Sequence, residues 1–193
     1  MDSKSLNMMN LLTSKIFHDL GNISALLGFF VSLNKEKPEK IDFNELIEIN
    51  RKFLVTLAIL KYAFLPGEHD ENAFEYLKEY FLERKLSINF EIDEFLFWQD
   101  HLTITTHVLI VLSKTLYDGA TVKILQKSEN NIEFIIKSNS NVAQSDLEQF
   151  ADVSKKGNIH LMLLQEMLEK NKLCCVYKFL TEKDCVLKYS PST

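Results

Sequence analysis

The chain has 193 residues, of which 46% are hydrophobic and 25% are charged, and its formal net charge is −5. Its Lys and Arg residues are interspersed with Asp and Glu, which argues against a nucleic-acid partner because phosphate backbones require clustered basic residues. No apolar run reaches the roughly 18 residues of a membrane helix, and the first ten residues lack the pattern of a signal peptide. Three cysteines, two of them adjacent, do not make a disulfide framework, so we expect a cytoplasmic protein without a membrane partner.

Two long helices are predicted in the N-terminal third, because apolar residues recur there at steps of three and four. The first helix is expected over about residues 5–33, and the second is expected to begin after Asp42, a possible cap, and to end before Pro66. The stripes consist of Leu12, Ile16, Leu20, Ile23, Leu27 and Phe30 in the first helix, and of Leu46, Ile49, Phe53, Leu57, Leu60 and Phe64 in the second.

Further apolar residues of this hairpin, Leu26, Phe29, Val31, Leu54 and Ile59, fall outside the two narrow stripes. A single hairpin cannot bury so much apolar surface by itself. We therefore expect residues 1–67 to dimerise, so that two hairpins close into a four-helix bundle.

Residues 68–193 are predicted to form a second domain in which helices and strands are mixed. Alternating apolar residues and turn signals predict the strands, and longer apolar periodicity predicts the helices. This order favours a mixed sheet with helices on one face, an α/β sandwich, so that the chain as a whole belongs to the α+β class. The expected elements are a helix at 72–84, a strand at 86–92, a helix at 101–116, strands at 120–126 and 132–138, a helix at 159–170, and strands at 173–180 and 185–190.

His18 is the candidate functional residue of the first helix. It lies two residues from both Ile16 and Leu20, about 200° around the helix from the apolar stripe at 100° per residue, so it is expected to point away from the packed face. A core position is therefore a poor explanation. A metal site is equally poor, because no other His or Cys lies within four positions. A surface histidine without a role is the remaining alternative.

The neighbours of His18 favour phosphoryl chemistry over that alternative. Neutral imidazole is a competent nucleophile toward phosphorus, and an exposed histidine is mostly neutral at pH 7. Asp19 follows directly and can orient the ring or take its proton. Asn22 can hold a water or a phosphoryl oxygen, and Lys15 can offset the charge of the phosphate.

Small residues surround the histidine on its helix face. Ser14, Gly21 and Ala25 leave room for a partner to approach the ring in line.

The segment "LTSKIFHDLGNISALLGF" resembles the phosphoacceptor helix of the ChpT-like histidine phosphotransferases of the alphaproteobacterial phosphorelay. It is more distantly similar to the dimerisation helix of sensor histidine kinases. The family pattern of a basic residue, two apolar or small residues and His-Asp-Leu is met from Lys15 to Leu20, and "LKYAF" at 60–64 resembles a basic-x-Ala-Phe segment of the family, with Lys61 in the basic place. Ile23 departs from the family, whose members commonly carry Pro there.

The resemblance extends over nearly the whole chain and implies a fold and a function. Residues 1–67 would be the phosphoacceptor and dimerisation hairpin, and residues 68–193 a degenerate ATPase-like domain of the Bergerat type. His18 would accept a phosphoryl group from an aspartate of one receiver domain and pass it to another. The implied partners are a second copy of the chain, response regulator receivers and an upstream hybrid histidine kinase. The chain would hold no cofactor of its own, since the receiver supplies Mg²⁺.

The motifs of an active kinase are missing from the second domain. The resemblance puts the Mg²⁺-binding Asn of the kinase fold at about Val111, which cannot coordinate the ion. No Asp-x-Gly-x-Gly follows residue 138, and the expected Gly-rich loop contains only Gly157, which gives a phosphate too few accessible N–H groups. An ATP-dependent kinase is therefore disfavoured, whereas a catalytically silent dimeric scaffold that binds response regulators is the main alternative.

Other histidines do not form a metal site in the sequence. His101 and His107 are six residues apart, which is not one helix face, and His160 stands alone.

Overall fold

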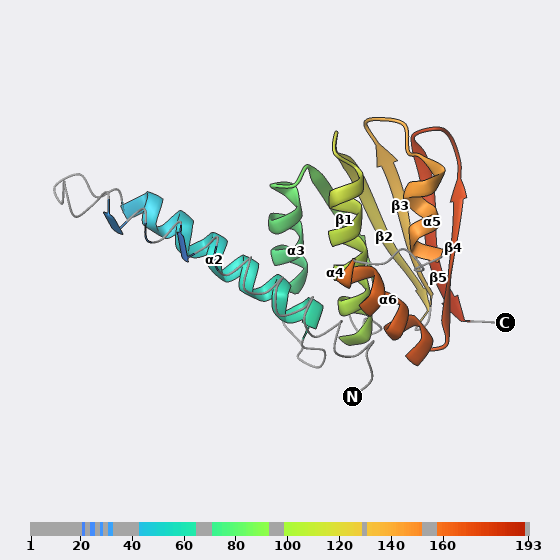
Figure 1. Ribbon diagram of the computed structural model, residues 1–193, viewed down its shortest axis with the longest axis horizontal. Coiled ribbons are helices and arrows are strands. Elements are labelled where there is room, and N and C mark those ends of the chain that lie inside the picture. Colours follow the sequence, from blue (N-terminus) through green and yellow to red (C-terminus); the bar gives the residue numbers. More distant parts are fainter. Residues whose placement is uncertain are drawn as a thin grey trace.

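The computed structural model shows a projecting helix joined to a sheet covered by helices (Figure 1). After the first helix, the elements among the described residues are, in chain order, α2 (Phe43–Phe64), α3 (Ala73–Leu82), β1 (Leu86–Glu91), α4 (Gln99–Thr115), β2 (Ala120–Ser128), β3 (Asn131–Ser138), α5 (Gln144–Ala151), α6 (Ile159–Lys170), β4 (Leu173–Phe179) and β5 (Asp184–Pro191). The residues that the structure describes are 21, 24–25, 28, 31–32, 43–64, 71–92, 99–128, 131–151 and 158–191.

The first predicted helix is represented by six described residues, all of them helical, between Gly21 and Ser32. The second predicted helix is confirmed as α2, which ends at Phe64, two residues before Pro66. Its first turn carries Glu45 and its last turn Lys61, and both charges complement the helix dipole. The expected cap, Asp42, lies outside the described residues.

The five strands form one mixed sheet in the order β1-β2-β3-β5-β4. Only β1 and β2 run parallel, whereas the pairs β2–β3, β3–β5 and β4–β5 are antiparallel. The two predicted hairpins, β2–β3 and β4–β5, are thus confirmed, and so is the α+β class. Burial alternates strictly along β3 and β5, as expected of strands with one face packed and one face toward solvent.

The core lies between the sheet and the helices on its packed face. In α4 every residue from His101 to Leu112 is buried, because α2 and α6 pack against this helix and its apolar side chains share one cluster with those of the sheet. A helix that is apolar on most of its circumference is expected in such a position.

Three helix-to-strand turns use the same backbone geometry. Lys85 after α3, Gly119 after α4 and Lys172 after α6 have positive φ values of 62°, 94° and 53°, the left-handed conformation that ends many helices. Gly119 is the most constrained of the three, since a Cβ there would lie 2.9 Å from the carbonyl oxygen of Lys85. This close approach brings the starts of the parallel strands β1 and β2 together.

The second half of α2 packs against α3 and α4, and the first half projects beyond them (Figure 1). Ile59 is 1% exposed and belongs to the same apolar cluster as the sheet domain. The sequence stripe had left Ile59 uncovered within the hairpin. The structure shows that a second copy is not needed to bury it, whereas Leu54 remains 51% exposed.

The sequence did not predict α5. The region after β3 reads as a polar stretch, but Leu147 and Phe150 are buried on one side of a short helix there. Two apolar residues three apart are too weak a periodic signal to predict a helix.

Among the residues described by the structure, no helix combines the length and the apolar character that a bilayer crossing needs.

Candidate functional site

Most of the predicted site falls outside the part of the chain that the structure describes. This applies to Ser14, Lys15, His18, Asp19 and Asn22. Their roles remain predictions, and the structure bears on them only through the helix that follows.

Gly21 and Ala25 are described, and both are helical and exposed. Gly28 and Ser32 are also helical and exposed, and they continue the series at steps of three and four. A Cβ built on Gly21 or Gly28 would meet no heavy atom of the described residues within 4 Å. The hydroxyl of Ser32 donates to the carbonyl of Gly28 at 2.8 Å. Gly21, Ala25, Gly28 and Ser32 thus form a series of small side chains that no described residue of the chain covers.

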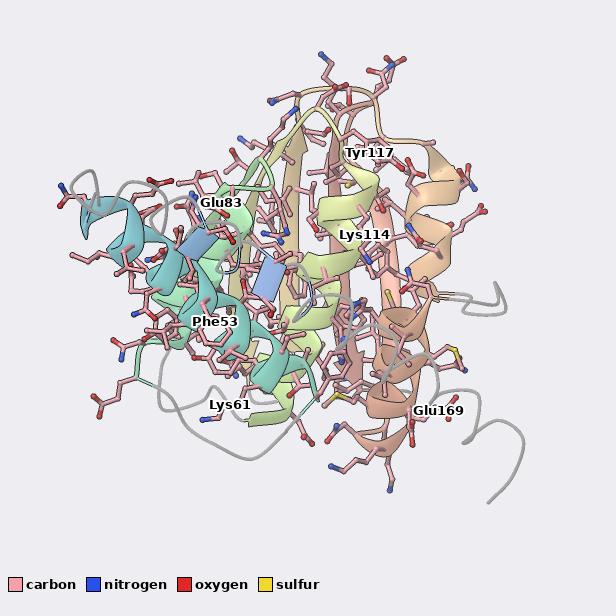
Figure 2. The ribbon with its side chains drawn as sticks, turned by 60° about the vertical axis from the view of Figure 1, so that its left-hand side comes forward. Phe53, Lys61, Glu83, Lys114, Tyr117 and Glu169 are labelled. Atoms are coloured by element: carbon pink, nitrogen blue, oxygen red, sulfur yellow. The ribbon has the colours of Figure 1, made fainter. Side chains whose placement is uncertain are left out.

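The family-like segment at 60–64 forms the last turn of α2. Lys61 is half-buried there, and Figure 2 shows it at the end of the helix where α2 meets the sheet domain. Tyr62 and Ala63 are buried in the core, and Phe64 contacts α4 and α6. The segment thus anchors α2 to the second domain.

The position that would hold Mg²⁺ in a kinase is filled by a core residue. Val111 is 1% exposed and packs in the main apolar cluster. The helix that would follow the Gly-rich loop, α6, is capped by its own chain: the side chain of Asn158 accepts a hydrogen bond from the backbone N–H of His160 at 3.1 Å.

A buried pair of histidines joins these two elements. The Nδ1 atoms of His107 on α4 and His160 on α6 lie 3.1 Å apart, and the ring of Phe64 lies 5.9 Å and 5.8 Å from the two imidazoles. A hydrogen bond at this distance needs a proton on one Nδ1 and none on the other, so the accepting ring is neutral. Burial lowers the pKa of His107 to about 4, and a hydrogen bond with the backbone of Ala63 opposes that shift.

This pair could not be predicted from the sequence, because its members are 53 residues apart and share no motif. Within the described ranges, no three His, Cys, Asp or Glu side chains are grouped so that they could hold an ion.

An open groove of about 500 Å³ lies between α2, α3 and β1. Its charged residues pair with one another: Arg51 donates to both carboxylate oxygens of Glu79, at 2.7 Å and 2.8 Å, and Lys78 donates to Glu75 at 2.7 Å. The bond from Arg51 lowers the pKa of Glu79. The sequence did not predict a site in this groove. The ion pair of Arg51 with Glu79 holds α2 against α3, and Lys78 and Glu75 pair within α3, which explains these charged residues without a ligand.

The arrangement of helices and sheet can be compared with known structures. A bacterial phosphotransferase is matched with a TM-score of 0.72 and 14% sequence identity over 98% of both chains. The chain has the fold of this phosphotransferase. At such low identity the match shows the fold alone.

Two histidine kinase domains are matched with lower scores. The blue-light activated histidine kinase of Erythrobacter litoralis gives a TM-score of 0.42 at 10% identity, with 98% of this chain and 94% of that chain covered. The histidine kinase AdeS of Acinetobacter baumannii gives 0.39 at 11%, with 91% and 98% covered. These scores are too low to establish a shared fold. No family model and no curated protein matches the sequence.

Proposed function

We propose that this chain is a histidine phosphotransferase of a bacterial phosphorelay, which carries a phosphoryl group between aspartates of receiver domains on His18. The observation that carries the proposal is the fold shared with a bacterial phosphotransferase over 98% of both chains. The open face at Gly21 and Ala25, which helical spacing continues to His18, supports the position of the reacting group.

The proposed chemistry needs one histidine and one carboxyl phosphate. The lone pair of a ring nitrogen of His18 attacks phosphorus, the N–P bond forms, and the P–O bond to the receiver's aspartate breaks to release its carboxylate. The proton on the other ring nitrogen is held by a hydrogen bond to Asp19 or passes to it. The reverse steps deliver the group to the aspartate of a second receiver.

Two further residues serve the phosphoryl group in this proposal. Lys15, one turn before the histidine, offsets its negative charge, and Asn22, one turn after, donates to one of its oxygens. Mg²⁺ comes with the receiver, and the chain contributes no metal ligand of its own.

A homodimer is the proposed assembly. Ile47 is 66% exposed on the projecting half of α2, Leu54 is 51% exposed on the outer face of its packed half, and Val31 on the first helix is 52% exposed. Large apolar side chains exposed together on a helical hairpin are an expected interface between copies, because a second hairpin would cover them in a four-helix bundle.

Direct packing between α4 and α6 supports transfer rather than ATP-dependent phosphorylation. The resemblance to the kinase fold puts phosphate binding between these two helices, at Val111 and at the start of α6. His107 and His160 are in contact across that place, and Val111 is enclosed in the core. An upstream hybrid histidine kinase would then be the source of the phosphoryl group.

The proposal is tested by incubating the full chain with a receiver domain that carries radiolabelled aspartyl phosphate. We expect label on the wild-type chain and none on His18→Ala, and we expect the label to be lost in acid and kept in alkali. His69→Ala, which removes a histidine outside the motif, is the matched control and should be labelled like the wild type. Equal labelling of His18→Ala would refute the proposal, and receiver binding without any label would favour the silent scaffold.

A further inference from the structure

Charged residues form the outermost contact between α2 and the sheet domain. Arg51 makes a two-fold hydrogen bond with the carboxylate of Glu79 at 2.7 Å and 2.8 Å, and the ammonium of Lys52 lies 3.2 Å from the carboxylate of Glu83. The two acidic residues are four apart and lie on one face of the α3 end. Two neighbouring cations of α2 thus meet two stacked anions of the sheet domain.

Apolar residues form the second contact, one turn further along α2. Val55, Ile59, Tyr62 and Ala63 are each no more than 3% exposed. The last three belong to the same apolar cluster as the buried residues of α3, α4 and the sheet. The interface is therefore continuous with the main core of the protein.

Aromatic rings form the third contact, at the end of the helix. Phe64 lies against both His107 of α4 and His160 of α6, with ring centroids 5.9 Å and 5.8 Å away. The last residue of α2 is in this way held between two elements of the sheet domain.

These three contacts act on one uninterrupted helix. From Arg51 to Phe64 they extend over about 20 Å at 1.5 Å per residue. Domains that swing do so about a few loop or terminal residues, and the interfaces that permit such motion are small and polar. A rotation of α2 about any one of its contacts would have to break the other two.

We infer that α2 and the sheet domain form one rigid body, so that the sheet domain keeps a fixed position relative to α2. What this rigidity means for receiver docking rests on the proposed function. A receiver that approaches His18 would always find the sheet domain in the same place. The domain would then be a fixed part of the receiver-docking surface, and not a domain that moves to reach the histidine.

The inference is tested by a distance measurement with pulsed electron paramagnetic resonance on the full chain. Spin labels are attached at Glu45→Cys, on the projecting end of α2, and at Lys137→Cys, on β3, in a Cys174→Ser background. Cys175 and Cys185 can stay, because burial raises the pKa of their thiols to about 12 and about 11. Excess unlabelled chain is added so that distances between subunits do not contribute.

A rigid body gives one narrow distance distribution, unchanged by Mg²⁺-ATP or by a receiver domain. A matched pair of labels within the sheet domain, at Lys137→Cys and Glu166→Cys, gives the reference width, and the first pair should be no broader. A broad or bimodal distribution, or a shift upon addition of either ligand, would overturn the inference.

Transfer measured on the same samples separates the two proposals. A narrow distribution together with no phosphoryl transfer would retain the rigid body and refute the proposed function. A broad distribution together with transfer to His18 would refute the rigid body and retain the proposed function.

Discussion

The histidine pair shows how single residues can link stability to pH in this fold. His107 and His160 share one hydrogen bond between their Nδ1 atoms, which exists only while at least one of those atoms carries no proton. Burial disfavours the charged form of His107 and lowers its pKa to about 4. The same ring has a pKa near 6.5 in an unfolded chain. Between these two pH values the unfolded state therefore binds a proton at this residue more readily than the folded state does.

We predict that the free energy of unfolding falls as the pH is lowered from about 6.5 to about 4, by up to about 3 kcal/mol from this residue. Below about pH 4 the contribution is lost and changes no further. Urea denaturation of the full chain at several pH values measures the slope, and His107→Phe should flatten it. His18→Ala, which removes a histidine predicted to face solvent, should keep the slope of the wild type. An unchanged slope in His107→Phe would contradict the assignment.

Gly21 permits a second test at the residue scale. No heavy atom of the described residues lies within 4 Å of a Cβ built there, and replacing a helical glycine by alanine stabilises a helix by roughly 0.5–1 kcal/mol. Gly21→Ala should therefore be at least as stable as the wild type. We predict that Gly21→Leu, equally able to fold, slows transfer to His18 by about tenfold or more because the side chain occupies the path of the receiver.

Gly119→Ala is the contrasting variant. Its φ is 94° and the added Cβ would meet the Lys85 carbonyl oxygen at 2.9 Å, so this substitution should lower stability.

If Gly21→Leu transferred as fast as the wild type, the small-residue face would have no part in receiver approach.

At the scale of elements, α2 has two faces with different partners. One face packs on α3 and α4 within the chain, and Figure 2 shows α2 lying along α3, with Phe53 in the middle of the helix and Glu83 at the end of its neighbour. The other face is still partly exposed at Ile47 and Leu54. The sequence stripe predicted the helix correctly but could not tell these faces apart, because both are apolar.

We predict that Ile59→Ala lowers the free energy of unfolding by about 2–5 kcal/mol, as expected when a core side chain is truncated. Leu54→Ala should change the stability within one chain by no more than about 0.5 kcal/mol and should weaken self-association instead. Urea denaturation and sedimentation equilibrium measure the two effects. The division of α2 into two faces would be wrong if Ile59→Ala proved as mild as Leu54→Ala.

At the scale of the whole molecule, much of the sheet domain could be predicted from local patterns. Alternation gave β3 and β5, and long apolar periodicity gave α4 and α6. α5 was missed because only Leu147 and Phe150 mark its buried side. The contact of His107 with His160 was missed because it depends on how α4 and α6 pack. The orientation of His18 is still a prediction from helical spacing.

The assembly is testable at the same scale. We predict that the full chain sediments as a dimer and that Ile47→Glu combined with Leu54→Glu gives a folded monomer, since the exposed apolar face would then carry like charges. The circular dichroism of the variant should match that of the wild type. A wild-type chain that is monomeric at high concentration would contradict the bundle.

The central claim is that His18 carries the phosphoryl group between receivers, and its most direct test is a rapid-quench measurement of phosphohistidine after mixing the chain with a phosphorylated receiver. We expect phosphate on His18 that appears as the donor's aspartyl phosphate disappears, and that is then passed on when a second receiver is added. Loss of the donor's phosphate as inorganic phosphate, with no phosphate on His18 at any time, would contradict it.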